Sequence, residues 1–149
     1  GQFGVARLEI LHAAIQNDSH GSPLPTGLLH RDVESFGAER EKLFESLRSA
    51  GRCTVSASGY VFSRPGRVAQ YLGPCLADSE VAARHLIAEH LQGPSRNWYW
   101  DLLPANAAAV RCAEESGFTR RRTLQRMSCG EKINTSDARI YAIAGFELG

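Results

Sequence analysis

Hydrophobic residues at helical spacing mark four segments of the chain. Each is bounded by polar residues and closed by a glycine at or near its end: residues 28–36, 38–50, 80–91 and 106–116. In the second segment Leu43, Phe44 and Leu47 share one face, and charged side chains cover much of the rest. An apolar stripe of this kind predicts a helix that packs against a core.

Alternating and β-branched residues predict five strands: residues 53–63, 68–74, 98–103, 118–129 and 140–148. The first two are separated by Arg64-Pro65-Gly66-Arg67, whose proline and glycine occupy the two central positions of a type II turn. A polar loop, residues 130–139, precedes the last strand. Strands alternate with helices in the middle and pair as hairpins at the ends, which predicts a mixed α/β sheet.

The N-terminal part of the chain is set apart from this pattern. We predict an N-terminal segment and linker over residues 1–27 and one domain over residues 28–149. Residues 5–15 are compatible with a helix or a strand, and we favour the strand. Turn-forming residues fill positions 17–27, which indicates a linker. The chain starts at Gly1 and its only methionine is Met127, so we expect it to be the C-terminal part of a longer protein.

Composition limits the classes of partner that this chain is expected to bind. The 149 residues carry a net charge of +1, which is poorly suited to phosphate neutralisation, so we expect no nucleic-acid partner. No apolar run is long enough to cross a bilayer, and the N-terminal stretch does not resemble a signal peptide. The four cysteines include no C-x-x-C pair. We therefore expect reduced thiols in a cytoplasmic protein, with no metal site.

Three polar features are candidates for chemistry. Arg120, Arg122 and Arg126 would share one face of a strand and could hold phosphates, although a solvated strand face is the preferred interpretation. Asp101 lies in an aromatic strand, and we expect it to pair with an arginine of the next strand. Among the histidines, none of the helical ones shows the i, i+4 spacing of a metal pair.

The segment from Trp98 onward reads WYWDLLPANAAAVRCAEESGF. It resembles the second half of a GNAT-superfamily acetyltransferase domain, whose Asn-x-x-Ala and Gly-Phe motifs match Asn106, Ala109, Gly117 and Phe118 in register. The closing IYAIAGFELG is similar to the C-terminal GNAT-like domain of two-domain members. The resemblance covers residues 28–149. It implies a GNAT-like acyl-CoA N-acyltransferase fold, with a central twisted mixed β-sheet flanked by helices.

The resemblance also implies a site and a reaction. Two parallel strands, residues 68–77 and 98–103, would splay apart and hold acetyl-CoA or another acyl-CoA in the gap. Backbone amides of the first strand and a helix-capping side chain would bind this cofactor, and the implied residues are Cys75, Leu76, Ala77 and Asn106. The acceptor would be a primary amine, either of a small molecule or of a protein N-terminus or lysine. The sequence is also compatible with a homodimer.

The chain departs from the family's pattern at two places that carry chemistry. Family members hold the CoA pyrophosphate with a glycine-rich loop at a helix N-terminus. Here residues 76–80 contain no glycine and include Asp78 and Glu80. The tyrosine that protonates the leaving thiolate is replaced by Ala113, so no catalytic residue is assigned. Two functions stay open: an acyltransferase domain acting on a primary amine, or a non-catalytic GNAT-like domain for ligand binding, substrate-pocket completion or subunit interaction.

Overall fold

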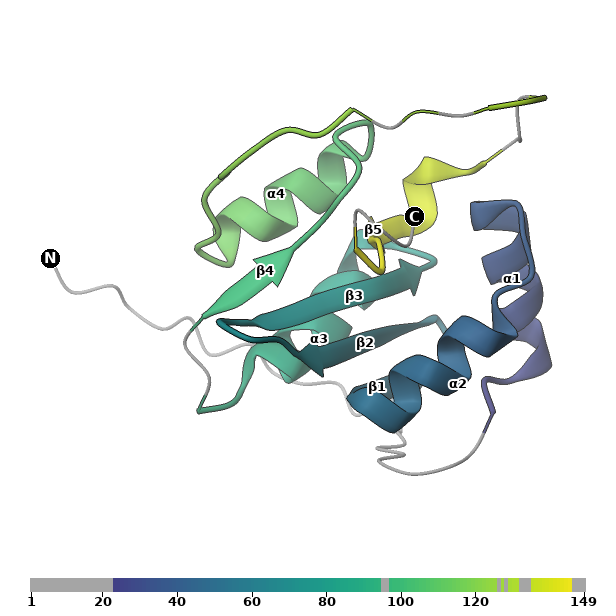
Figure 1. The fold of residues 1–149 in the computed structure, drawn as a ribbon, viewed down its shortest axis with the longest axis horizontal. Helices are drawn as coiled ribbons and strands as arrows, with labels where there is room; N and C mark the ends of the chain where they lie inside the picture. Colours follow the sequence, from purple (N-terminus) through teal and green to yellow (C-terminus); the bar gives the residue numbers. More distant parts are fainter. Residues whose placement is uncertain (1–22, 95–96, 126, 128, 132–134, 146–149) are drawn as a thin grey trace, which may run out of the picture.

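The computed structural model describes residues 23–94, 97–125, 127, 129–131 and 135–145 (Figure 1). The predicted strand at residues 5–15 and the end of the predicted closing strand lie outside the described residues. Within the described ranges no helix is long and apolar enough to span a bilayer.

Among the described residues, five strands form one mixed sheet: β1 (Arg52–Ser56), β2 (Gly59–Pro65), β3 (Gln70–Ala77), β4 (Trp98–Trp100) and β5 (Ile140–Ala142). β1, β2 and β3 are antiparallel neighbours, whereas β4 pairs parallel with β3. β5 pairs antiparallel with β3. The predicted mixed α/β architecture is confirmed.

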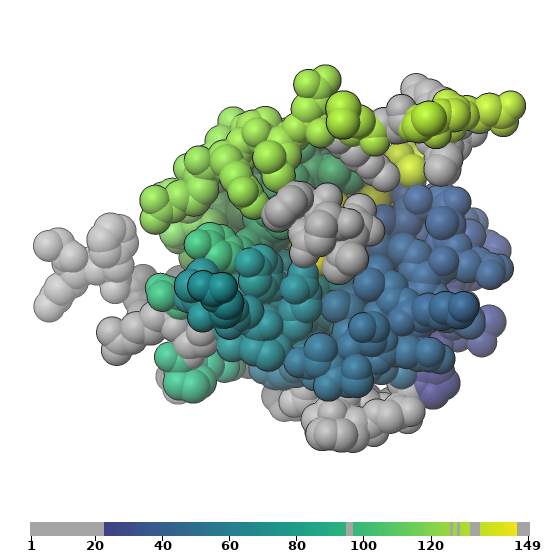
Figure 2. Space-filling view, in the orientation of Figure 1, coloured from purple at the N-terminus to yellow at the C-terminus, as the bar shows by residue number. Residues whose placement is uncertain are grey.

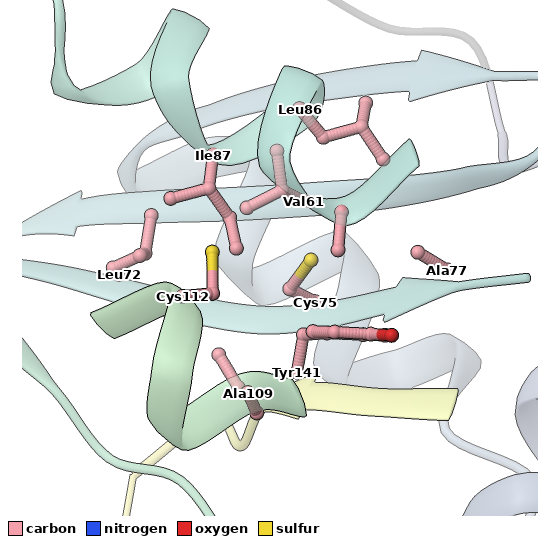
Figure 3. Packing of buried hydrophobic residues seen from close by; sticks show 11 residues of the cluster. Val61, Leu72, Cys75, Ala77, Leu86, Ile87, Ala109, Cys112 and Tyr141 are labelled. Atoms are coloured by element: carbon pink, nitrogen blue, oxygen red, sulfur yellow. The ribbon is translucent and has the colours of Figure 1, made fainter. Parts of the chain in front are cut away.

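Four helices cover the two faces of the sheet: α1 (Thr26–Phe36), α2 (Glu41–Ala50), α3 (Glu80–Leu91) and α4 (Ala107–Glu115). Because side chains alternate along a strand, β2 sends Tyr60 and Phe62 into one core and Val61 into the other. The first core also contains residues of α1 and α2, and the second contains residues of α3 and α4 (Figure 3). The sheet is therefore buried on both faces.

Two predictions about the hairpins need correction. The predicted strand 53–63 is two strands, because Ser56 pairs with Gly59 and the chain reverses between them. The Ser58 amide donates to the Ser56 hydroxyl, 3.2 Å away, which stabilises this turn. The β2–β3 connection also lies later than predicted: Pro65 pairs with Gln70. Gly66 is required in that loop, since a Cβ atom there would lie 2.3 Å from the Tyr71 ring.

Strands in the second half are shorter than predicted. Residues 118–125 are extended without strand pairing, and residues 101–103 follow β4 without continuing it. Of the predicted closing strand, Ile140–Ala142 pairs with β3, and a short 3-10 helix, Asp137–Arg139, precedes it. These segments have the composition of strands but do not pair along their whole length. A segment can pair only where the assembled sheet offers it a free edge, which its own sequence does not determine.

A buried ionic cluster fixes α1 against the sheet. Asp32 of α1 is fully buried and accepts two hydrogen bonds from Arg40, at 3.0 Å and 2.6 Å. The Tyr60 hydroxyl of β2 donates to the same carboxylate. The Arg40 guanidinium also lies 3.4 Å from the centre of the Phe36 ring. One arginine thus neutralises Asp32 and holds the start of α2 between α1 and β2.

Replacing Arg40 by alanine should lower the free energy of unfolding by about 3–5 kcal/mol, because Asp32 would stay buried without its counter-charge. Urea unfolding measures this loss. Adding Asp32→Asn to Arg40→Ala removes the buried charge but keeps an acceptor for the Tyr60 hydroxyl, so it should restore part of the stability. A double variant no more stable than Arg40→Ala would contradict this explanation.

A second buried polar group lies on the other side of the sheet. His90 of α3 is 2% exposed and its ring nitrogens lie 2.9 Å from the Ser63 hydroxyl and 2.8 Å from the Thr54 hydroxyl. Burial, assisted by the charge of nearby Arg52, lowers the pKa of His90 to about 3. The imidazole is therefore neutral in the folded protein and joins α3 to β1 and β2.

Acid should destabilise the fold through His90. Its pKa is lower in the folded chain than the ordinary value of 6.5, so the unfolded chain binds the extra proton between these two values. The contribution of His90 to stability is fully present above pH 6.5. Below that pH the free energy of unfolding should fall by up to about 1.4 kcal/mol per pH unit. Urea unfolding at several pH values tests this, and His90→Gln should remove most of the slope. An equal slope in both proteins would rule out His90 as the source.

Candidate functional site

The parallel strands β3 and β4 part after three pairs of residues. Gln70, Tyr71 and Leu72 of β3 pair with Trp98, Tyr99 and Trp100 of β4. Beyond Trp100 the chain leaves the sheet and enters α4, while β3 continues to Ala77. The splayed arrangement that the resemblance implies is therefore present, although the separation begins at Leu72.

The space between the splayed segments is occupied by β5. Cys75 pairs with Ala142 and Leu76 with Ile140, so β5 uses the edge of β3 that β4 has left. On its other side the Ile143 amide donates to the Asp101 carbonyl, 2.9 Å away. β5 lies beside the end of β3 in Figure 1. The gap is filled by main chain from the C-terminal part of the protein.

Side chains from three other elements hold this segment by its carbonyl groups. The Asn106 amide donates to the Ile140 carbonyl at 2.9 Å and to the Ala138 carbonyl at 3.3 Å. The Trp100 indole donates to the Tyr141 carbonyl at 2.7 Å. Arg64 donates to the Ala144 carbonyl at 2.9 Å. Residues 138–144 are therefore held by side-chain hydrogen bonds to their main-chain carbonyl groups.

Of the four predicted site residues, Cys75, Leu76 and Asn106 contact β5. Cys75 and Leu76 pair with β2 on one edge of β3 and with β5 on the other, and Ala77 pairs with Gly59. Asn106 caps α4, since its side-chain oxygen accepts from the Ala109 amide at 3.1 Å, and its amide holds the Ile140 carbonyl. Acyl-CoA binding by these residues stays a prediction.

The N-terminus of α3, where the family binds a pyrophosphate, carries a capping serine and two carboxylates that are paired with arginines. Ser79 caps the helix by accepting from the Ala82 amide at 3.2 Å. Glu80 is bound by Arg84 at 2.7 Å and by Arg111 of α4 at 2.9 Å, and these hydrogen bonds lower its pKa. Asp78 pairs with Arg31 of α1. Both carboxylates at this end of α3, Asp78 and Glu80, are thus engaged by arginines.

Sequence reasoning identified the two carboxylates and missed their partners. The spacing of Glu80 and Arg84 is the i, i+4 pattern of a helical ion pair, which could have been recognised. Arg31 and Arg111 come from distant helices, and nothing in the sequence marks them as neighbours of this helix end.

The thiols near the gap are buried. Cys75 and Cys112 are at most 1% exposed and lie in the same core as Tyr141 (Figure 3). Burial raises the pKa of both thiols and of the Tyr141 hydroxyl. At neutral pH all three are protonated, so neither cysteine supplies a thiolate here.

The two remaining candidates from the sequence, the arginine row and Asp101, lie along a groove beside β4. This groove of about 1600 Å³ is lined by residues of β4, α4 and the segment 116–125, including Tyr99 and Arg120. Residues 119–125 are exposed (Figure 2), and they form no strand, so the predicted arginine row does not share a strand face. Arg126 lies outside the described residues. Within those residues Asp101 makes no ion pair, which corrects the expected pairing, and no cluster of metal-ligating side chains occurs.

Comparison with known proteins assigns the fold to a family. Residues 28–142 match the model of the acetyltransferase (GNAT) domain, and the chain belongs to that family. The crystal structure of a Pyrococcus horikoshii protein assigned as an acetyltransferase superposes with a TM-score of 0.80 at 20% sequence identity, over 97% of this chain and 48% of that one. This chain thus spans about half the length of that protein. A search among curated sequences gave no match.

A glycine at the point of separation lets β5 approach β3. Gly73 has a φ of +129°, and a Cβ atom there would lie 2.2 Å from the Ile143 carbonyl oxygen. Gly73→Ala should lower the free energy of unfolding by about 2 kcal/mol or more, from backbone strain and loss of this contact. Gly93→Ala is the matched control, because a Cβ atom there meets nothing within 4 Å. Equal urea midpoints for the two variants would show that the approach of Ile143 is unimportant.

Proposed function

We propose that this chain serves the transfer of an acyl group from acyl-CoA to a primary amine, as a GNAT domain that does not itself hold the acyl-CoA. It acts within a longer acyltransferase of the cytoplasm, where another domain binds the cofactor and this one completes the substrate pocket. The observation that carries the proposal is the pairing of β5 with β3 in the gap between the splayed strands.

Two features of the sequence support the same conclusion. Ala113 stands where the family places the acid that protonates the departing thiolate, and alanine has no proton to give. At the N-terminus of α3, Ser79 and the paired Glu80 occupy the position that would bind the pyrophosphate. The acid of the usual mechanism is therefore missing, and the Glu80 carboxylate stands where the family binds an anion.

The groove beside β4 supports a role in completing a pocket. It combines aromatic side chains of β4 with the carboxylate of Glu114 and the exposed Arg120. The aromatic faces and the carboxylates of Asp101 and Glu114 are suited to an amine, which is the class of acceptor that GNAT proteins use. Arg120, Arg121 and Arg122 add positive charge to the same groove. The groove runs along β4 and reaches the filled gap, because Asp101 and Ile143 also line it.

Calorimetric titration of the full chain with acetyl-CoA tests the proposal. We expect no binding heat at about 1 mM ligand, because β5 would have to leave before the cofactor could enter. Desulfo-CoA, which has the same nucleotide and pantetheine parts, serves as a non-reactive comparison. Saturable binding of either ligand below about 100 µM would contradict the proposal and favour acyl transfer in this domain's own gap.

A further inference from the structure

We propose that two copies of this chain pair through the outer edge of β4, so that a second copy covers the groove beside that strand. The inference goes beyond the proposed function, because it concerns the outer side of β4 and needs no acyl-CoA. It rests on the direction of the main-chain groups at that edge, on the exposed side chains around it and on the charges of the groove.

β4 lies at the end of the sheet. It pairs with β3 on one side, and no strand among the described residues pairs with its other side. On the inner side the Gln70 amide donates to the Asn97 carbonyl at 2.9 Å. Further along, the Ile143 amide donates to the Asp101 carbonyl, also at 2.9 Å. Neighbouring residues of an extended chain direct their main-chain groups to opposite edges, so those of Trp100 point outward and can accept another strand.

Exposed apolar side chains gather around this edge. Val68 is 66% exposed, Tyr99 42% and Leu124 51%, and all three line the groove. Single exposed apolar residues are ordinary on a protein surface, whereas several along one groove indicate a contact surface. The groove of about 1600 Å³ also exceeds the roughly 300–1,000 Å³ of a typical small-molecule site. A small amine would therefore leave much of the groove uncovered.

A second copy suits this surface because the surface is complementary to itself. In an antiparallel pair of β4 strands centred on Trp100, the N–H and C=O groups of one copy meet the C=O and N–H groups of the other. Asp101 then lies opposite Tyr99, so no like charges face each other along the paired strands. The groove also carries both arginines, at positions 120–122, and the carboxylates of Asp101 and Glu114. A two-fold axis therefore allows arginines of one copy to face carboxylates of the other.

The expected dimer is weak. β4 has three residues, so the paired edge is short, and small interfaces of this kind form concentration-dependent complexes. The net charge of +1 gives little repulsion between copies. In sedimentation experiments on the full chain we therefore expect monomers at about 1 µM and mostly dimers at about 500 µM.

Val68→Lys tests where the interface lies. The added ammonium group sits in the groove, where pairing would remove it from water, so dimerisation should weaken about tenfold or more. Val81→Lys is the matched control, because Val81 is 63% exposed on α3 and does not line the groove. It should leave the dimerisation constant unchanged. Both positions are exposed to solvent, so both variants should keep the fold, and urea unfolding verifies this.

Hydrogen–deuterium exchange identifies the paired edge. The Trp100 amide should exchange about fivefold more slowly at the higher concentration than at the lower one. The Gln70 amide, which is bonded to the Asn97 carbonyl within the sheet, should show no such dependence. A chain that stays monomeric at about 500 µM would overturn the inference and leave this edge to a different partner. A dimer that survives Val68→Lys, or that leaves exchange at Trp100 unchanged, would overturn it too, because its interface would lie elsewhere.

Discussion

One edge of β3 determines how this domain is assembled. After Leu72 that edge loses its parallel partner β4, and the backbone groups of a buried strand must still be hydrogen-bonded. A ligand with amide groups, water or another strand could satisfy them. Here β5 does so, at Cys75 and Leu76. Because the edge has room for one partner, the identity of that partner decides whether the gap is a ligand site or part of the core.

This constraint explains how a family fold and an altered site occur together. The GNAT domain is recognised by the order of its strands and helices and by the residues that join β4 to α4. Asn106 retains its position at the start of α4, but its amide contacts the protein's own main chain. Fold membership therefore gives the architecture, and the chemistry follows from which groups the site leaves accessible.

Charged and polar residues away from the gap serve the assembly. On the face of the sheet covered by α1 and α2, Arg40 neutralises Asp32. On the face covered by α3, His90 lies within hydrogen-bond distance of two hydroxyl groups. At the N-terminus of α3, arginines from α1 and α4 engage Asp78 and Glu80. In each case a buried or crowded polar group has a partner on another element, which fixes the helices relative to the sheet. These partners cannot be read from local sequence.

The sequence by itself determined the helices and the family, because these depend on periodicity, capping residues and motifs within short segments. Cys75, Leu76 and Asn106 contact β5 in the structure, and their role in binding acyl-CoA stays a prediction. Only the tertiary structure decided what fills that gap. Ile140 and Cys75 are far apart in the chain, and strand pairing depends on which edge is available once all the elements have packed. The pairing that makes residues 140–142 a strand thus also places them between the diverging strands β3 and β4.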